Sequence, residues 1–197
     1  MIPEPIAVTL LVTKALERLG VAYLVGGSLA STVHGELRTT MDTDLVANLR
    51  PEHVTPFVDA LKAAFYADEG MIRDAIARCG SFNLIHLDTM FKVDVFIPKQ
   101  RPFDVEQMRR RTRYVVATEP EHAVCVATAE DTILAKLEWY RLGGDVSERQ
   151  WRDVIGVIKV QGERLDSAYL RHWAASLGVS ELLKRALTET DADPTRS

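Results

Sequence analysis

The sequence predicts an α/β unit, in which helices flank a mixed sheet, followed by a bundle of helices. Two observations support this. Up to about residue 118, short β-branched or alternating apolar runs lie between segments with helical spacing. Beyond the break at Glu119-Pro120, apolar residues recur only at helical spacing. We therefore expect two domains, residues 1–118 and residues 119–197.

In the first domain, apolar residues at three- and four-residue spacing predict a helix over residues 8–19, which Gly20 ends. The β-branched and aromatic run at 21–25 predicts a buried strand that stops at a Gly-Gly pair. The further elements expected here are a helix at 28–34, a strand at 42–47, an amphipathic helix at 51–65, and strands at 81–88, 91–97 and 113–117.

The second domain shows four helical patterns. They cover residues 129–142, 148–161, 166–177 and 180–187. The polar tail over 190–197 is expected to fray.

Composition excludes several classes of protein. With 197 residues, 47% hydrophobic and 26% charged, the chain resembles an ordinary globular protein, and its net charge of −4 gives no global sign of nucleic-acid binding. Cys79 and Cys125 form no Cys-x-x-Cys pair, which argues against structural zinc and disulfides. Glu4 and Pro5 stand where a signal peptide carries basic residues, and no apolar run reaches about 18 residues. We expect a cytoplasmic protein with no membrane partner.

The most informative motif joins a glycine turn to paired acids. Gly26, Gly27 and Ser28 follow the strand at 21–25, and after thirteen intervening residues Asp42 and Asp44 lie two positions apart. Glycine lets the backbone approach a phosphate closely. Residues two apart on a strand share a face, where two carboxylates repel each other unless a cation lies between them, and hard oxygen ligands suit Mg²⁺. The motif predicts phosphoryl or nucleotidyl transfer.

Two further residues are candidates for the same site. Asp94 lies on the more polar side of the alternating strand at 91–97 and would be a third carboxylate that ligates metal or accepts a proton. The alternative is a solvent-facing acid paired with Lys92. Arg38 precedes the acid pair by four residues and would bind the triphosphate, or is an exposed loop arginine.

Charged residues within apolar helical arcs add candidates in the second domain. Lys136 and Asp153 lie among apolar neighbours, which is costly unless the charges are paired or functional. Either Lys136 reaches the phosphates and Asp153 positions it, or Lys136 snorkels, or the two form a buried ion pair. The arginines between Arg101 and Arg113 form the one local basic cluster, either a solvated face or a phosphate-binding surface.

The motif resembles the signature of the nucleotidyltransferase superfamily, in which an apolar residue and Gly-Gly or Gly-Ser precede Asp-x-Asp by about a dozen residues. Val25 to Ser28 and Asp42 to Asp44 match it, although Thr43 replaces the apolar residue often found between the acids. The resemblance implies a nucleotidyltransferase-like fold. It also implies metal ligation by Asp42, Asp44 and Asp94 and nucleotide binding by Gly26, Gly27 and Ser28.

A narrower resemblance, over about residues 21–160, is to the AbiEii-type nucleotidyltransferase toxins, which include the MenT toxins. The matching residues in the first domain are Arg38, Thr40, Asp42, Asp44 and Leu45. Those in the second are Glu130, Asp131, Lys136, Arg141, Arg152 and Asp153, where the pattern is only thinly Glu-rich. This likeness implies that Asp42 and Asp44 are catalytic, that Asp94 supports them, and that Lys136 and Asp153 face the substrate.

The expected function is therefore that of an enzyme that moves a nucleoside monophosphate from an NTP to an acceptor hydroxyl and releases pyrophosphate. It would use Mg²⁺, with two ions at the acids. The favoured acceptor is tRNA, as for a toxin held in check by an antitoxin protein. The alternatives are an aminoglycoside-type small-molecule transferase and a non-catalytic nucleotide-binding module; a protein-AMPylating antitoxin is normally shorter than this chain.

Overall fold

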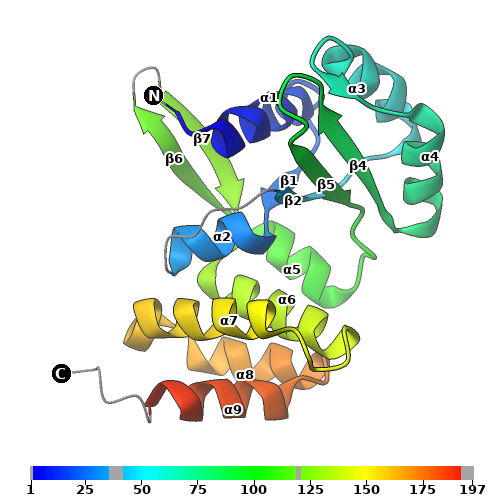
Figure 1. Ribbon diagram of the computed structural model, residues 1–197. Coiled ribbons are helices and arrows are strands. Elements are labelled where there is room, and N and C mark those ends of the chain that lie inside the picture. Colours follow the sequence, from blue (N-terminus) through cyan, green and yellow to red (C-terminus); the bar gives the residue numbers. More distant parts are fainter. Residues whose placement is uncertain (1, 36–41, 119–120, 192–197) are drawn as a thin grey trace. The chain divides into compact units, whose positions relative to one another are not determined.

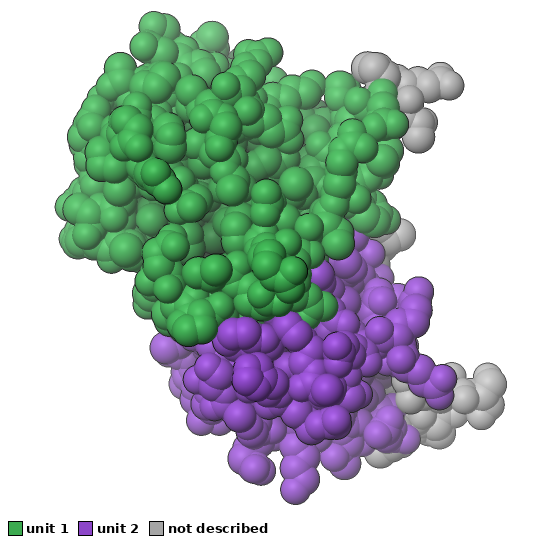
Figure 2. Space-filling model, turned by 180° about the vertical axis from the view of Figure 1, so that it is seen from behind, with its two compact units in different colours: residues 1–29, 39–127 green, residues 30–38, 128–197 purple. Residues whose placement is uncertain are grey.

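A computed structural model describes residues 2–35, 42–118 and 121–191 and divides the chain into two compact units (Figure 2). Unit 1 contains residues 1–29 and 39–127, and unit 2 contains residues 30–38 and 128–197. The boundary falls inside helix α2 (Gly27–His34), so this helix starts in unit 1 and ends in unit 2. None of the described helices is both long and apolar enough to cross a membrane.

Unit 1 is built on a seven-stranded mixed sheet with the order β3-β4-β5-β2-β1-β7-β6 (Figure 1). β2 pairs in parallel with β5, and β1 pairs in parallel with β7, whereas the other neighbours are antiparallel. The strands are β1 (Tyr23–Val25), β2 (Asp42–Ala47), β3 (Phe65–Tyr66), β4 (Ser81–His86), β5 (Lys92–Phe96), β6 (Thr112–Thr118) and β7 (Glu121–Val126). The mixed sheet and its flanking helices confirm the expected architecture.

Helices cover one face of this sheet. α1 (Glu4–Arg18) packs against β2 and β7, α3 (Val54–Leu61) packs on α1, and α4 (Glu69–Arg78) packs on β4 and α3 (Figure 1). The strand side chains on that face alternate with more exposed ones and are buried because the helices remove their apolar area from water. They include Leu45, Ala47, Phe82, Leu84, Val93 and Val95.

Unit 2 is a helical bundle. Its helices after α2 are α6 (Ala129–Leu142), α7 (Glu148–Gln161), α8 (Ser167–Ser176) and α9 (Ser180–Asp191), with a short 3-10 turn η2 (Gly162–Arg164). The side-chain oxygens of Thr128, Ser147 and Asp166 accept backbone N–H groups at the starts of α6, α7 and α8, which explains why those helices begin there. The end of α2 joins the bundle through Gln161, whose Nε2 donates to the His34 carbonyl at 2.6 Å.

Several elements differ from the expectation. The helix expected at 51–65 is a 3-10 turn η1 (Pro51–His53) followed by α3, because Phe65 leaves the helix and pairs with β4. α4 and α5 (Pro102–Arg110) were not expected, since each buries only two side chains and so has little apolar periodicity. α9 continues to Asp191, so the start of the tail expected to fray is helical.

The division of the chain also differs from the one expected at residue 119. Residues 119 and 120 lie outside the described part, but β7 beyond them pairs antiparallel with β6 and parallel with β1. The apolar run in β7 is short and follows a proline, which is why its sequence reads as the start of the helical half. Sheet pairing therefore carries unit 1 on to residue 127.

Candidate active site

Three carboxylates lie together on the half-buried face of two adjacent parallel strands. In the register of β2 and β5, Asp44 is opposite Asp94, and Asp42 is opposite Lys92. Neighbouring strands are about 4.8 Å apart, and alternate residues share a face, so all four side chains emerge on the same side of the sheet. We call this group of Asp42, Asp44, Lys92 and Asp94 the acid face. The structure thus places the three acids expected at the site on one face of the sheet.

The opposite side of β2 explains the threonine between the acids. Thr43 is buried, and its hydroxyl lies 2.9 Å from that of Thr9 on α1. Because the Thr9 hydroxyl donates to the Pro5 carbonyl at 2.6 Å, it accepts from Thr43. A polar residue is tolerated here because its hydrogen bond is made. α1 therefore covers the side of β2 opposite Asp42 and Asp44.

The Gly-Gly-Ser turn lies directly beside the second acid. The Gly26 backbone N–H donates to the Asp44 carbonyl at 2.9 Å. Gly27 has a φ of +53°, and a Cβ added there would overlap the Asp44 carboxylate and come within 2.8 Å of its Cβ. Glycine is required at this position for two reasons: the positive φ angle, and the Asp44 carboxylate that fills the space of a side chain. α2 starts at this turn, and Ser28 in its first turn is buried.

Lys92 supplies a positive charge to the acid face. Its Nζ lies 2.8 Å from Asp94 Oδ2, with the Asp94 side chain 15% exposed and that of Lys92 44% exposed. The hydrogen bond to Asp94 raises the pKa of Lys92, and the charges of Asp94, Asp42 and Asp44 act in the same direction. A cation at this place is therefore stabilised by all three acids. The sequence left open whether Asp94 serves the site or is a solvent-facing acid paired with Lys92, and the structure contains this ion pair.

The acid face suits a magnesium ion in its chemistry. It offers hard oxygen donors from adjacent strands, and it stabilises positive charge, as the raised pKa of Lys92 shows. Across the described residues, however, no three acidic, imidazole or thiol side chains converge closely enough to form a metal cluster. The three acids therefore share a face without converging on one point, and Lys92 contacts one oxygen of Asp94.

The arginine candidates differ in their surroundings. Arg38 lies outside the described residues. In the basic cluster from Arg101 to Arg113, three arginines form ion pairs with nearby acids: Arg101 with Asp104, Arg109 with Glu106, and Arg113 with Glu121. The hydrogen bond from Arg109 also lowers the pKa of Glu106. Much of the cluster's charge is thus neutralised locally, as expected of a solvated face.

In unit 2, Lys136 on α6 and Asp153 on α7 form a buried ion pair. Lys136 Nζ lies 2.8 Å from Asp153 Oδ2, and the two side chains are 5% and 7% exposed. Lys136 also donates to Gln150 Oε1 at 3.0 Å. The ammonium therefore does not snorkel to the surface, and its position is held by groups on α7. We call Lys136 and Asp153 the buried charge pair.

A second polar cluster in unit 2 centres on Asp131, which is fully buried. Its carboxylate accepts hydrogen bonds from the Thr128 hydroxyl at 2.8 Å and the Tyr169 hydroxyl at 2.6 Å. Nearby, Glu130 Oε1 accepts the Asp166 backbone N–H at 3.1 Å. The sequence signal for part of this cluster is the Thr-x-x-Asp pattern of a helix start. Both acids thus stabilise the start of α6 and its contact with α8.

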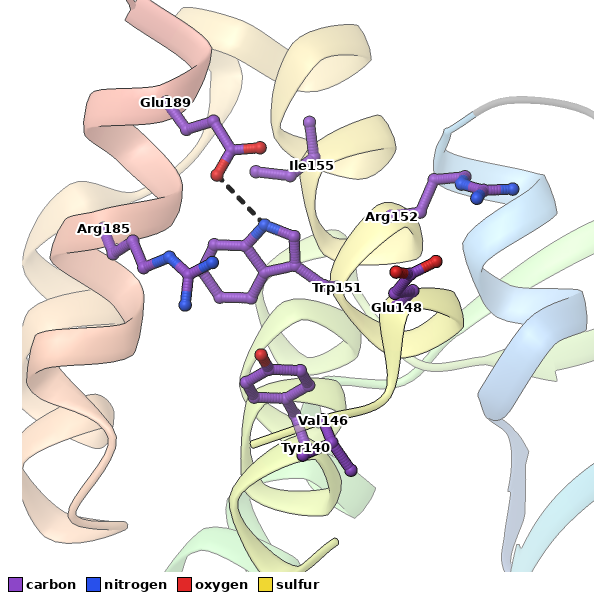
Figure 3. A pocket seen from close by; sticks show the side chains of 8 residues that line it. All are labelled: Tyr140, Val146, Glu148, Trp151, Arg152, Ile155, Arg185 and Glu189. Atoms are coloured by element: carbon purple, nitrogen blue, oxygen red, sulfur yellow. Dashed lines mark hydrogen bonds between the residues drawn. The ribbon is translucent and has the colours of Figure 1, made fainter. Parts of the chain in front are cut away.

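A pocket of about 330 Å³ lies among α6, α7 and α9 of unit 2 (Figure 3). Trp151 is at its centre, with the Arg185 guanidinium 4.2 Å from its ring and the Tyr140 ring 5.3 Å away. The Trp151 indole N–H donates to Glu189 at 3.0 Å (Figure 3). Trp151 therefore joins α7 to α9. The pocket lining contains two arginines and two glutamates, so its charges balance.

Comparison with solved structures identifies the fold. The chain is similar to an antigenic nucleotidyltransferase-like protein from Paracoccidioides brasiliensis, with a TM-score of 0.53 and 19% identity over 87% of this chain and 90% of that one. This likeness confirms the expected nucleotidyltransferase-like fold.

Two weaker similarities are to an antibiotic adenylyltransferase and to an antibiotic-resistance factor. The lincosamide adenylyltransferase LnuA, bound to lincomycin, has a TM-score of 0.45 and 12% identity over 76% of this chain and 93% of that one. The antibiotic-resistance factor ANT(2'')-Ia has a TM-score of 0.46 and 14% identity over 88% of this chain and 96% of that one. No protein-family model and no curated protein matches the chain.

Proposed function

We propose that the chain is a Mg²⁺-dependent nucleotidyltransferase that moves a nucleoside monophosphate from an NTP to an acceptor hydroxyl and releases pyrophosphate. The observation that carries this proposal is the position of Asp42, Asp44 and Asp94 on one face, beside a glycine turn that closely approaches Asp44. The nucleotidyltransferase-like fold supports it. A sheet face with three crowded carboxylates costs energy unless a cation offsets the repulsion, which favours a functional over a structural role.

The site residues of unit 1 would divide three tasks in this proposal: metal ligation, phosphate binding and proton acceptance. Asp42, Asp44 and Asp94 would hold Mg²⁺, which supplies charge neutralisation for the triphosphate and the departing pyrophosphate. The Gly27 amide and the Ser28 hydroxyl would bind phosphate oxygens at the positive end of α2. Gly26, whose N–H donates to the Asp44 carbonyl, would let the nucleotide approach the turn closely because it has no side chain. Asp94 would also accept the proton of the attacking hydroxyl, since its carboxylate is partly exposed. Arg38, outside the described residues, would bind the triphosphate.

In unit 2, Lys136 and Asp153 would act toward the substrate. The Lys136 ammonium is held between Asp153 and Gln150, and a preorganised cation binds phosphate without losing much side-chain entropy. In this proposal Asp153 is a positioning residue for Lys136. The proposed role of Lys136 and Asp153 rests on the resemblance of the sequence pattern around them to that of the AbiEii-type toxins.

The proposed acceptor is tRNA, in the cytoplasm, with the enzyme acting as a toxin that an antitoxin protein holds in check. This choice rests on the run from Arg38 to Leu45, which follows the AbiEii-type pattern. The rival acceptor, an aminoglycoside, is cationic and needs an excess of acids in its binding pocket. The aminoglycoside arm of the experiment below therefore tests this rival directly.

The test is to incubate the purified protein with each radiolabelled NTP and Mg²⁺, together with either total tRNA or an aminoglycoside. We expect labelled tRNA and released pyrophosphate, and no label with EDTA. Label on the aminoglycoside but never on RNA would replace the acceptor and the toxin role while keeping the reaction. Binding of Mg²⁺–NTP without transfer to any acceptor would favour the non-catalytic nucleotide-binding module, and failure to bind any Mg²⁺–NTP would refute the transferase.

A further inference from the structure

Lys92 is the one charged residue of the acid face that the proposed reaction does not use. It lies opposite Asp42 in the strand register and two positions before Asp94 on the same side of β5. Its ammonium contacts Asp94 through Oδ2 at 2.8 Å. The contact therefore occupies an oxygen atom of a residue proposed to ligate metal.

An ammonium and a divalent cation cannot both use that oxygen fully. The ammonium donates protons to the lone pairs that a metal would need, and it lowers the negative potential at the carboxylate. The acid face carries three carboxylates and one ammonium, so its net charge is −2 with Lys92 and −3 without it. Lys92 thus opposes metal binding in two ways, by occupying Asp94 and by reducing the attraction of the face.

We propose that Lys92 is an internal competitor of the divalent cation for Asp94, which keeps the affinity of the acid face for free metal low and makes metal binding depend on the nucleotide. A nucleoside triphosphate brings its own negative charges, which attract both the metal and the Lys92 ammonium that Asp94 releases. Lys92 is suited to such an exchange because its side chain is 44% exposed and so can leave Asp94 without crossing the core. This inference rests on the proposed function.

The experiment is to titrate Mg²⁺ alone, by calorimetry at low salt, into the full-length protein and its Lys92→Met variant. We expect the variant to bind Mg²⁺ about fivefold more tightly, as follows from the usual strength of a partly exposed ion pair. The difference should shrink as salt is added, because the charges are partly exposed. In EDTA the variant should melt at a lower temperature than the parent protein, and Mg²⁺ should restore more of its stability.

Two further variants separate competition from other effects. Lys92→Arg keeps the positive charge and should keep the low Mg²⁺ affinity. Lys62→Met is the matched control. Lys62 pairs with the exposed Asp59 of α3, and its substitution removes the same charge from the same unit. It should leave Mg²⁺ affinity unchanged.

The possible failures are distinguishable. Equal or weaker Mg²⁺ binding by Lys92→Met, or an equal gain in Lys62→Met, overturns the role of Lys92 but leaves the transferase in place. If neither the parent protein nor the Lys92 variants bind Mg²⁺, with or without NTP, the proposed function fails and the inference fails with it.

Discussion

On the acid face of unit 1, the ion pair of Lys92 with Asp94 lies at a half-buried surface, whereas in unit 2 the buried charge pair lies in the interior. The Asp94 and Lys92 side chains are 15% and 44% exposed, but those of Asp153 and Lys136 are 7% and 5% exposed. The ion pair in unit 2 is therefore shielded from water, whereas the one in unit 1 keeps access to solvent.

The difference has a physical reason. A buried charge without a partner costs several kcal/mol, so deep burial is tolerated only for balanced, hydrogen-bonded pairs. An unbalanced group of acids survives where water or a bound cation lowers the repulsion. Loss of an acid from the acid face should therefore remove function, whereas loss of either charge of the buried charge pair should remove stability.

The largest expected effect is on the acid face. Asp42→Ala should lower nucleotide transfer about a thousandfold or more, because the metal that neutralises the phosphates loses a ligand. Stability without metal should not fall, since one of the repelling acids is removed. Transfer rates and urea unfolding in EDTA measure the two effects.

Asp59→Ala is the matched control, because Asp59 is an exposed acid of the same unit and pairs with Lys62. It should transfer nucleotide at the parental rate. Retained activity in Asp42→Ala would remove the acid face from the reaction.

The next largest effect concerns the buried charge pair. Lys136→Met should lower the free energy of unfolding by about 3–5 kcal/mol, because it leaves the Asp153 carboxylate buried without its ammonium partner. Adding Asp153→Leu should recover much of the loss. Urea unfolding measures both variants, and Lys62→Met, which breaks an exposed pair, serves as control.

A change below about 1 kcal/mol in Lys136→Met would contradict the view that this pair is a stability element. If the folded Lys136→Met protein also binds NTP less well, the pair has both a structural and a substrate role. Unchanged NTP binding would leave only the structural one.

A smaller effect is expected at the turn beside the acids. Gly27→Ala should cost about 1–2 kcal/mol more than Gly20→Ala. Both glycines have positive φ, +53° and +67°, but only at Gly27 does an added Cβ meet the Asp44 carboxylate. Displacement of that carboxylate should also weaken Mg²⁺ binding. Thermal unfolding and calorimetry test this, and equal losses in the two variants would show that the close approach to Asp44 has no energetic consequence.

The smallest effect is expected on the reverse side of β2. Thr43→Val should change the free energy of unfolding by no more than about 1 kcal/mol, because the exchange keeps side-chain volume and removes one hydrogen bond to Thr9. Mg²⁺ affinity should be unchanged, since Thr43 points away from the acids. A large loss of Mg²⁺ affinity would show that the two sides of β2 are coupled.

The sequence by itself determined the local parts of this protein. Strand β2 and helices α6 and α7 have the expected bounds, since a period of two or of 3.6 residues is a local property that needs no partner. The glycine turn and the i, i+2 acids were visible for the same reason. α4 and β7 were missed because they depend on packing and pairing with other segments, and not on a strong local pattern. α5 was missed because it buries only Phe103 and Gln107 and so shows little apolar periodicity.

Only the tertiary structure decided which residues meet. The parallel register of β2 and β5 sets Asp44 opposite Asp94 and Lys92 opposite Asp42, and a shift by one residue would have turned those side chains to the other face. The choice between a snorkelling Lys136 and a buried ion pair likewise depended on α6 packing against α7. Helical and strand periods fix the face on which a residue lies, whereas its partner depends on contacts between segments far apart in the chain, which no local pattern encodes.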